Sequence, residues 1–404
     1  MPNAPILNGV PGSLLDIIKK CKIGGWTPFD VTKIEVLNGL ATFYFNYTNC
    51  NIPAYSILTF TGCDEPLLNN TFTVITGGSN KAIFETTVAD GTYLGSIKAV
   101  PEAAGWELMF SGTNQAVIRS GNLESSRTVV QITDTQSTTC QFEFGSDATS
   151  VTNIIDNTLS FNNRTKNILK SRDAVANNWR GWFIVTDNTT TYIFTDVYTM
   201  GATIIPKDNL VNALPCFYGD YLGVEDDNET PFAFSFNGNN PNDTGYNSYA
   251  GHINQSNVYY NYSDSNYENT RSLVRTTQFR VKAWAHAFIY AQVNSIQNTW
   301  RWSGGASKYS LYNLNKIESF HKDIPVHTSP MANSNLAYMA GKLPGIKFSE
   351  IALINIYNGF TTSKDELTDD IYLYLPTKGD MSYTLSVTTD SGMVPFIMNK
   401  KWGT

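Results

Sequence analysis

The sequence predicts a mainly β protein, built from β-sandwich or barrel-like domains with one short N-terminal helix. Charged residues make up only 16% of the 404 residues, well below the quarter or so that is usual in globular proteins. Thr, Ser, Asn and Tyr fill the gap, and β-branched and aromatic side chains pack well on a pleated sheet. Short runs of alternating apolar and polar residues, separated by Gly, Asn and Asp, are typical of strands and turns. With 42% hydrophobic residues, the chain is long enough for two or three domains.

Residues 1–30 are predicted to form an N-terminal arm and a short helix that belong to the core domain. The first part, 1–12, is rich in Pro, Asn and Gly, which predicts an extended arm that is mobile until partners bind. A capping-box pattern, Ser13-x-x-Asp16, then begins a helix that ends near Lys22, before two glycines. The apolar face of this helix consists of Leu14, Leu15, Ile17 and Ile18. We expect the helix to pack on its own domain, and the alternative is that a neighbouring subunit receives it.

Residues 31–100 are predicted to form a small inserted β-domain, either a barrel or a sandwich. Five short strands are expected at 41–47, 56–60, 71–76, 82–86 and 93–100, with turns at 62–64, 77–80 and 90–91.

Residues 101–215 are predicted to form a core β-domain, and residues 216–404 a C-terminal β-domain. The clearest element is a hairpin in which strands 181–186 and 191–195 flank a polar loop. The C-terminal domain has a long polar-aromatic loop near 237–269, dominated by Asn, Gly, Tyr and Ser. Its strands are expected at 279–290, 351–356, 371–375, 383–388 and 394–398.

The sequence contains none of the common catalytic or cofactor motifs, such as G-x-G-x-x-G, the Walker-type phosphate loop, H-E-x-x-H or G-x-S-x-G. We therefore expect no enzymatic activity, no cofactor and no metal. His321 and His327 would share a metal ion only if a loop folded them together around Asp323. Residues 225–229 resemble part of a calcium loop but lack its Gly and its final Glu, so a solvated loop is expected there.

A cluster of acidic residues near the C-terminus allows a different reading. It consists of Asp365, Glu366, Asp369 and Asp370. Paired carboxylates of this kind catalyse glycoside hydrolysis, which would make the chain a depolymerase. Their spacing also fits an exposed helical turn, which we favour.

Aromatic residues raise the question of carbohydrate binding, because aromatic rings stack on sugars. The chain has eight Trp and 22 Tyr residues. The candidates are Trp300, Trp302, Tyr259 and Tyr260. The same residue types fill sandwich cores and subunit interfaces, so a core or interface role is favoured over a glycan site.

Charge, hydropathy and cysteine content exclude several classes of partner. The net charge is −7 and the Lys and Arg residues are scattered, whereas nucleic-acid binding needs clustered cations. No apolar run approaches the ~18 residues of a membrane-spanning helix, and no signal peptide is expected. The five cysteines form no C-x-x-C pair and are expected to be free, buried thiols of a chain made in a reducing cytoplasm. A Cys50–Cys63 bridge is the alternative.

Seven blocks follow one another in a characteristic order. They are 4–21 (APILNGVPGSLLDIIKKC), 103–121 (AAGWELMFSGTNQAVIRSG), 127–135 (RTVVQITDT), 148–156 (ATSVTNIID), 171–194 (SRDAVANNWRGWFIVTDNTTTYIF), 216–221 (CFYGDY) and 342–353 (KLPGIKFSEIAL). Together they resemble a family of virion structural proteins of tailed bacteriophages, and the match covers most of the chain. The first two blocks commonly lie close together in that family, so residues 31–100 look like an insertion, similar to the decorating or spacing modules of tail and baseplate proteins.

The resemblance implies a non-enzymatic structural subunit of the virion, in the neck, collar or tail. Its partners would be other virion structural proteins and further copies of itself, arranged as a ring or collar around a closed axis. Its location would be the virion, after assembly in the cytoplasm of the bacterial host. The alternative is a glycan-binding adhesin on the virion surface that contacts host polysaccharide.

Overall fold

The computed structural model describes residues 1–47, 52–155, 165–171, 174–176, 179–196 and 213–220, followed by shorter segments. Those segments are 222–223, 232–235, 272–274, 286–289, 291–292, 301–303, 321–329, 338–349, 361–364, 369–378, 391–399 and residue 402. The described part consists mainly of β-strands, with one α-helix, α1 (Ser13–Lys22), near its start. The predicted mainly β fold class is therefore confirmed.

The chain divides into two compact units. The first comprises Met1–Ile6 and Asp16–Ala104, and the second comprises Leu7–Leu15 and Gly105–Thr404. The boundary falls inside α1, so the first turn of the helix belongs to the second unit and the rest to the first. A separate domain beginning at residue 216 stays a prediction.

Helix α1 forms where the sequence predicts it, and its apolar face is buried as expected. Leu14, Ile17 and Ile18 are completely enclosed. The helix ends when Gly24 adopts a positive φ of 126° and its N–H donates to the carbonyl of Lys19 (3.0 Å), a conformation that glycine adopts without steric cost.

The opening residues are packed against their own chain rather than extended and free, and their mobility before partners bind stays a prediction. In the first unit, Trp26 Nε1 donates to the carbonyl of Pro2 (3.1 Å), and Asn3 Nδ2 donates to the carbonyl of Pro28 (2.9 Å). In the second unit, Leu7 is fully buried and pairs with Arg180 in an isolated bridge. Two hydrogen bonds and the buried side chain of Leu7 thus fix parts of this Pro- and Gly-rich stretch.

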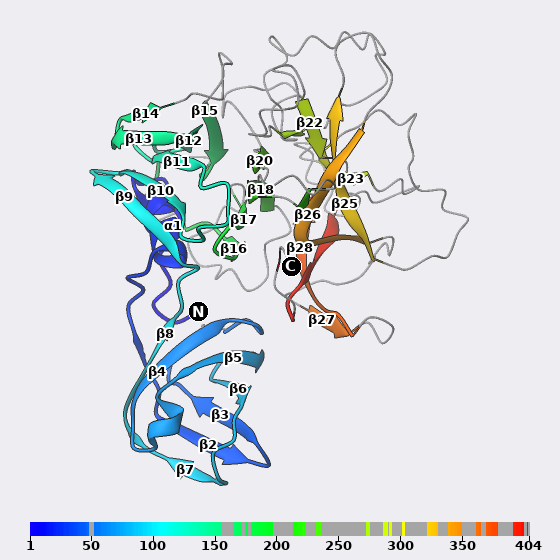
Figure 1. The fold of residues 1–404 in the computed structure, drawn as a ribbon. Coiled ribbons are helices and arrows are strands. Elements are labelled where there is room, and N and C mark those ends of the chain that lie inside the picture. The colour runs from blue at the N-terminus through cyan, green and yellow to red at the C-terminus, as the bar shows by residue number, and fades with distance from the viewer. Residues whose placement is uncertain are drawn as a thin grey trace. The chain divides into compact units, whose positions relative to one another are not determined.

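The strands of the first unit close into a barrel (Figure 1). They are β1 (Phe29–Asp30), β2 (Lys33–Leu37), β3 (Leu40–Tyr44), β4 (Ile57–Cys63), β5 (Thr71–Thr76), β6 (Lys81–Glu85), β7 (Gly91–Tyr93) and β8 (Gly95–Pro101), with a 3-10 turn, η1 (Pro66–Leu68). The sheet order is β1-β8-β4-β5-β6-β3-β2-β7. Because β1 continues into β2 and β7 into β8, the pairs β1–β8 and β2–β7 join the two ends of this sheet. Closure removes the free edges through which open sheets aggregate.

Phenylalanine rings fill the interior of the barrel. Alternate residues of β2, β3 and β6 are buried, as period-two strands with one inner face require. The ring of Phe60 lies 5.0 Å from that of Phe43 and 5.3 Å from that of Phe84, and all three are fully buried. Phe72 stacks on Phe84 at 4.1 Å.

Two local features of the barrel differ from the sequence prediction. The turn predicted at 62–64 is instead a β-bulge inside β4, where the pairing with β8 shifts between Thr61 and Cys63. A hairpin between β2 and β3 was missed, although Asn38–Gly39, with φ of 52° and 76°, is the residue pair that a two-residue hairpin turn favours. The other three expected strands, from 71 onwards, agree with β5, β6 and β7–β8 to within about two residues.

The bulge yields a stability prediction. Gly62 has a φ of 76°, and a Cβ there would lie 2.4 Å from the carbonyl oxygen of Ser96. Gly62→Ala is therefore expected to lower the free energy of unfolding of the first unit by at least about 1–3 kcal/mol, measured by urea denaturation. Gly91→Ala is the matched control, because its Cβ would make only ordinary contact with the Tyr93 ring, at 3.4 Å. Equal losses in the two variants would contradict the argument.

The second unit contains several antiparallel sheets (Figure 1). One sheet has the order β15-β12-β11-β10-β9, and another has the order β16-β17-β18-β20. Their strands are β9 (Trp106–Gly112), β10 (Gln115–Ser120), β11 (Val129–Thr133), β12 (Thr139–Gly145), β15 (Thr165–Leu169), β16 (Trp182–Thr186), β17 (Thr190–Asp196), β18 (Ala213–Asp220) and β20 (Phe232–Ser235). The small hairpin of β13 (Asp147–Ser150) and β14 (Asn153–Ile155) follows β12.

These two sheets pack face to face around one tyrosine. Tyr218 on β18 is fully buried, and its ring lies 5.8 Å from Trp106, 5.8 Å from Phe142 and 6.1 Å from Phe144. These three rings come from β9 and β12, so the contacts join the sheets as in a β-sandwich. The predicted hairpin is confirmed as β16–β17, with Thr186 opposite Thr191.

The remaining strands form one large sheet and a short hairpin. The large sheet has the order β21-β22-β25-β26-β29-β28-β27, with β19 beside β26. Its strands are β19 (Leu222–Gly223), β21 (Ser272–Val274), β22 (His286–Ile289), β25 (His321–Ser329), β26 (Tyr338–Ser349), β27 (Thr361–Lys364), β28 (Ile371–Lys378) and β29 (Ser391–Ile397), and the hairpin is β23 (Ala291–Gln292) with β24 (Arg301–Ser303). Strands predicted at 371–375 and 394–398 correspond to β28 and β29, and β22 lies within the strand predicted at 279–290. The strands predicted at 351–356 and 383–388, and the loop near 237–269, lie outside the described residues.

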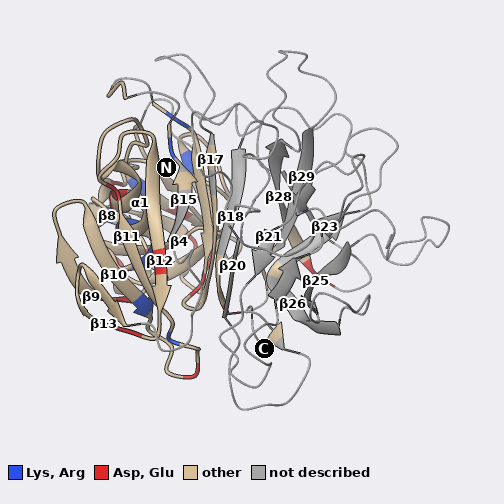
Figure 2. Ribbon diagram, turned by 90° about the horizontal axis from the view of Figure 1, so that it is seen from above, with Lys and Arg blue, Asp and Glu red and all other residues tan. Residues whose placement is uncertain are grey.

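Acidic and basic residues are interspersed along the described strands and loops, as the red and blue segments of Figure 2 show. Within that part of the chain, no helix combines the length and the apolar character that crossing a bilayer requires.

Candidate functional site

The aromatic residues predicted for glycan or subunit contact are not part of a described site. Trp300, Tyr259 and Tyr260 lie outside the described residues, and Trp302 lies on β24 without a described side chain. Their role stays a prediction.

The described members of the C-terminal acidic cluster do not form an exposed helical turn. Asp369 has a φ of 56°, and its carbonyl accepts a bond from Asn399 Nδ2 (2.8 Å). Asp370 is buried and directly precedes β28. The helical turn was therefore wrong at these two positions, because the chain here starts a sheet strand. Asp365, Glu366 and residues 225–229 lie outside the described residues.

No loop folds His321 and His327 together. His321 and His327 both lie on β25, and a strand advances about 3.3 Å per residue, so their backbones lie roughly 20 Å apart. In the described segments no three His, Cys, Asp or Glu side chains gather as metal ligands would. Cys63 and Cys140 are free and buried, as expected, whereas Cys21 is free and half-buried. Burial of its thiol raises the pKa of Cys21 to about 12, which disfavours the thiolate form.

Three polar clusters in the second unit stand out instead. The first, the Asp134 cluster, is a buried ion pair at the start of α1. The Asp134 carboxylate contacts the Lys170 ammonium, and both side chains are fully buried. Asp134 Oδ2 accepts bonds from the N–H groups of Leu14 (2.9 Å) and Leu15 (3.1 Å), and Lys170 donates to the carbonyl of Val10 (2.8 Å). Burial raises the pKa of Asp134, while the Lys170 charge and the two N–H groups act in the opposite direction.

The Asp134 cluster takes over the role of the predicted capping box. Ser13 Oγ donates to the carbonyl of Asn8 (2.9 Å), and Asp16 pairs with Lys20 (2.9 Å), so neither caps the helix. The first N–H groups of a helix have no partner inside it, and negative charge is favourable there. Asp134 meets both needs from just beyond the end of β11, so the capping-box prediction was wrong.

The second, the Asp220 cluster, joins the end of β18 to the loop between β10 and β11. Asp220 is 6% exposed. Its Oδ2 accepts a bond from Ser126 N–H (3.0 Å), and its Oδ1 accepts one from Ser126 Oγ (2.6 Å). Burial, together with the charge of Asp187, raises the pKa of Asp220 to about 7 against the weaker effect of the Ser126 bonds. Thr190 Oγ1 donates to the Asp220 carbonyl (2.9 Å).

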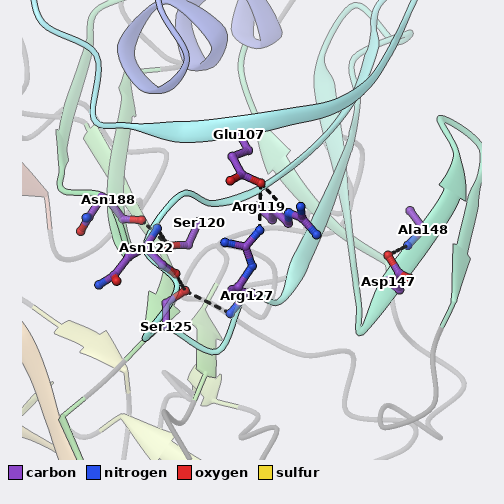
Figure 3. Close-up of polar contacts among 9 residues, drawn as sticks. All are labelled: Glu107, Arg119, Ser120, Asn122, Ser125, Arg127, Asp147, Ala148 and Asn188. Carbon is purple, nitrogen blue, oxygen red and sulfur yellow. Dashed lines mark hydrogen bonds and ion pairs between the residues drawn. The ribbon is translucent and has the colours of Figure 1, made fainter.

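The third, the Glu107 cluster, is drawn in Figure 3. Glu107 Oε2 accepts bonds from Arg119 Nε (2.7 Å) and Arg127 Nη2 (2.9 Å). The Arg119 bond and the positive charge of both arginines hold the pKa of Glu107 below its usual value. Beside it, Ser120 Oγ donates to the carbonyl of Asn188 (2.6 Å), which ties β10 to the β16–β17 loop.

These clusters connect segments that are far apart in the sequence. Asp134 lies 120 positions from Leu14, and Asp220 lies 94 positions from Ser126. The buried carboxylates of Asp134 and Asp220 therefore connect distant segments of the second unit. Glu107, with a side chain 42% exposed, is open to solvent and is held by two arginines.

Sequence reasoning missed all three clusters. In the first cluster, the only local feature that Asp134 and Lys170 share is that each directly follows the last residue of a strand, β11 and β15. Their partners could not be read from the chain, because pairing over such separations depends on how the strands pack.

Comparison with known proteins adds little to this picture. No protein-family model and no curated protein matches the chain. Among solved structures, the chain is similar to the endosialidase of phage phi92, with 8% identity, coverage of 93% of this chain and 52% of the endosialidase chain, and a TM-score of 0.16. The chain thus spans about half the length of that protein, and a score this low does not establish a shared fold.

Proposed function

We propose that this chain is a non-enzymatic structural subunit of a tailed-phage virion, located in the neck, collar or tail. The strongest support comes from hydrogen bonds between the blocks of sequence that carry the family resemblance. Asp134 belongs to block 127–135 and bonds to Leu14 and Leu15 of block 4–21. Asp220 belongs to block 216–221 and bonds to Ser126, which directly precedes block 127–135. The resemblance therefore includes the side chains that hold the second unit together.

The chemistry of these clusters suits a building block. A buried ion pair such as Asp134–Lys170 locks one arrangement of segments, and breaking it is costly. A subunit that transmits force or keeps a ring in register needs such fixed connections. The closed barrel of the first unit fits the role of a spacer or decoration, because it is stable without a free edge for pairing. We further propose that copies assemble around a closed axis with other virion proteins.

The test is the composition of purified particles of the phage that encodes the chain. We expect quantitative mass spectrometry to find the chain at a constant copy number per particle that matches the symmetry of a ring seen by cryo-EM. Particles from a nonsense mutant of its gene should lack that ring or the parts beyond it. A chain that is abundant in the lysate but absent from washed particles would refute the proposal.

A further inference from the structure

Ser126 and Arg127 attach the loop between β10 and β11, residues 121–128, to β18 and β9. Ser126 bonds to Asp220 through its N–H and its hydroxyl, and Arg127 bonds to Glu107. Within the loop, Ser125 Oγ donates to the carbonyl of Asn122 (2.7 Å). Figure 3 shows Asn122, Ser125, Arg127 and Glu107.

The closed loop carries features that disfavour it. Arg127 has a φ of 50°, a left-handed conformation that is strained for a residue other than glycine. Its Nη1 atom is buried and meets no acceptor in the described part of the chain, although buried donors are normally bonded. Leu123 is 80% exposed at the tip of the loop. The Ser126–Asp220 contact therefore has to offset strain elsewhere in the loop.

Asp220 can be protonated without any rearrangement of the backbone at Ser126. Ser126 Oγ lies 3.1 Å from Thr128 Oγ1 and also accepts a bond from Thr128 N–H (3.3 Å). If Asp220 Oδ1 carries a proton, the Ser126 hydroxyl can turn to donate to Thr128 Oγ1 and accept from Asp220. Every group then has a partner.

The surroundings of Asp220 stabilise its ionised form less well than its protonated form. Among the described residues, Ser126 supplies the two hydrogen bonds to its side chain, and Asp220 is only 6% exposed. The charged group acting on it is Asp187, on the β16–β17 loop, whose like charge opposes ionisation. Asp187 itself accepts bonds from Thr189 N–H (2.8 Å) and Thr190 N–H (2.6 Å), which favour its own negative charge.

We propose that Asp220 and loop 121–128 form a proton-dependent latch, closed when the buried carboxyl is protonated and loosened when it is ionised. Opening the loop exposes Asp220 to water, where it titrates near its ordinary value of 3.8 rather than about 7. A group whose pKa is higher in the closed form stabilises that form at low pH and loses this effect as pH rises between the two values. The latch therefore loosens between about pH 4 and pH 7 and changes little above that range.

Hydrogen exchange of the full chain tests the latch. We expect the protection of amides in 121–128, corrected for intrinsic exchange, to fall roughly seventy-fold from pH 5 to pH 7.5, which is the change that the two pKa values imply for one proton. In Asp220→Asn, which keeps an acceptor for Ser126 but cannot ionise, protection should be the same at both pH values. Asp147→Asn is the matched control and should retain the seventy-fold change, because Asp147 is exposed and, among the described residues, its side chain accepts a bond from the neighbouring Ala148 N–H.

Two results would overturn the latch. One is wild-type protection of 121–128 that does not depend on pH, a measurement that needs no variant to fold. The other is a pH dependence in Asp220→Asn as large as in the wild type. These readouts do not depend on whether the chain is a virion subunit.

Discussion

Lys170→Met is expected to lower the free energy of unfolding of the second unit by about 3–5 kcal/mol, because it leaves the Asp134 carboxylate buried without its counter-charge. Both side chains of the pair are fully buried, and the methionine fills much of the lysine's volume. The loss would be measured by urea denaturation followed by tryptophan fluorescence.

Arg119→Met is the matched control for this experiment, because Arg119 lies on β10 in the second unit. Arg119 and Glu107 form an ion pair open to solvent, with side chains 33% and 42% exposed, and Arg127 still pairs with Glu107 in the variant. Such an exposed pair contributes little to stability, so its loss should be small. Equal losses in the two variants would show that the Asp134 cluster does not hold the unit together.

The same variant should acquire a pH dependence. Without Lys170, burial raises the pKa of Asp134 unopposed by the ammonium, so the folded state binds a proton more tightly than the unfolded state. The stability of Lys170→Met should therefore be higher at pH 5 than at pH 8, relative to the wild type. A loss that is constant with pH would mean that another group limits stability.

Phe60→Ala is expected to lower the free energy of unfolding of the first unit by about 3–5 kcal/mol, the usual effect of a cavity in a phenylalanine core. Phe60 is fully buried and contacts the rings of Phe43 and Phe84. Urea denaturation combined with peptide-resolved hydrogen exchange would assign the loss to β4 and its neighbours in the barrel.

The control here is Leu67→Ala. Leu67 lies on η1 with 64% of its surface exposed, so its truncation should change stability by less than about 0.5 kcal/mol. Phe60→Leu should fall between the two, because leucine refills part of the cavity. If Phe60→Ala were no more harmful than Leu67→Ala, the barrel interior would not be the source of the first unit's stability.

The function proposed above depends more on connections than on any reactive group. The proposal starts from blocks of sequence, and the structure adds that Asp134 joins two of them, 127–135 and 4–21. A building block needs a durable framework, and the clusters provide one. The latch proposed at Asp220 would make one loop of that framework responsive to pH.

Local patterns in the sequence were sufficient for many individual elements. The strand at 71–76 was predicted with its observed bounds, and the hairpin of β16 and β17 was predicted with its loop. Helix α1 was predicted from its apolar face and its glycine stop. These features depend on neighbouring residues, since side chains alternate every second position in a strand and recur every three or four in a helix.

The sequence by itself determined the fold class, the helix and most strands of the first unit, because each depends on contacts within a few residues. Only the tertiary structure decided that β1–β8 and β2–β7 pair to close the barrel, that Asp134 caps α1 from 120 positions away, and that Asp220 is buried against Ser126. The physical reason is that a carboxylate's solvation and partners are set by strands that meet only after folding. In the sequence, Asp134 and Asp220 look like surface residues. In the folded chain, Asp134 caps α1 and Asp220 forms the proposed latch.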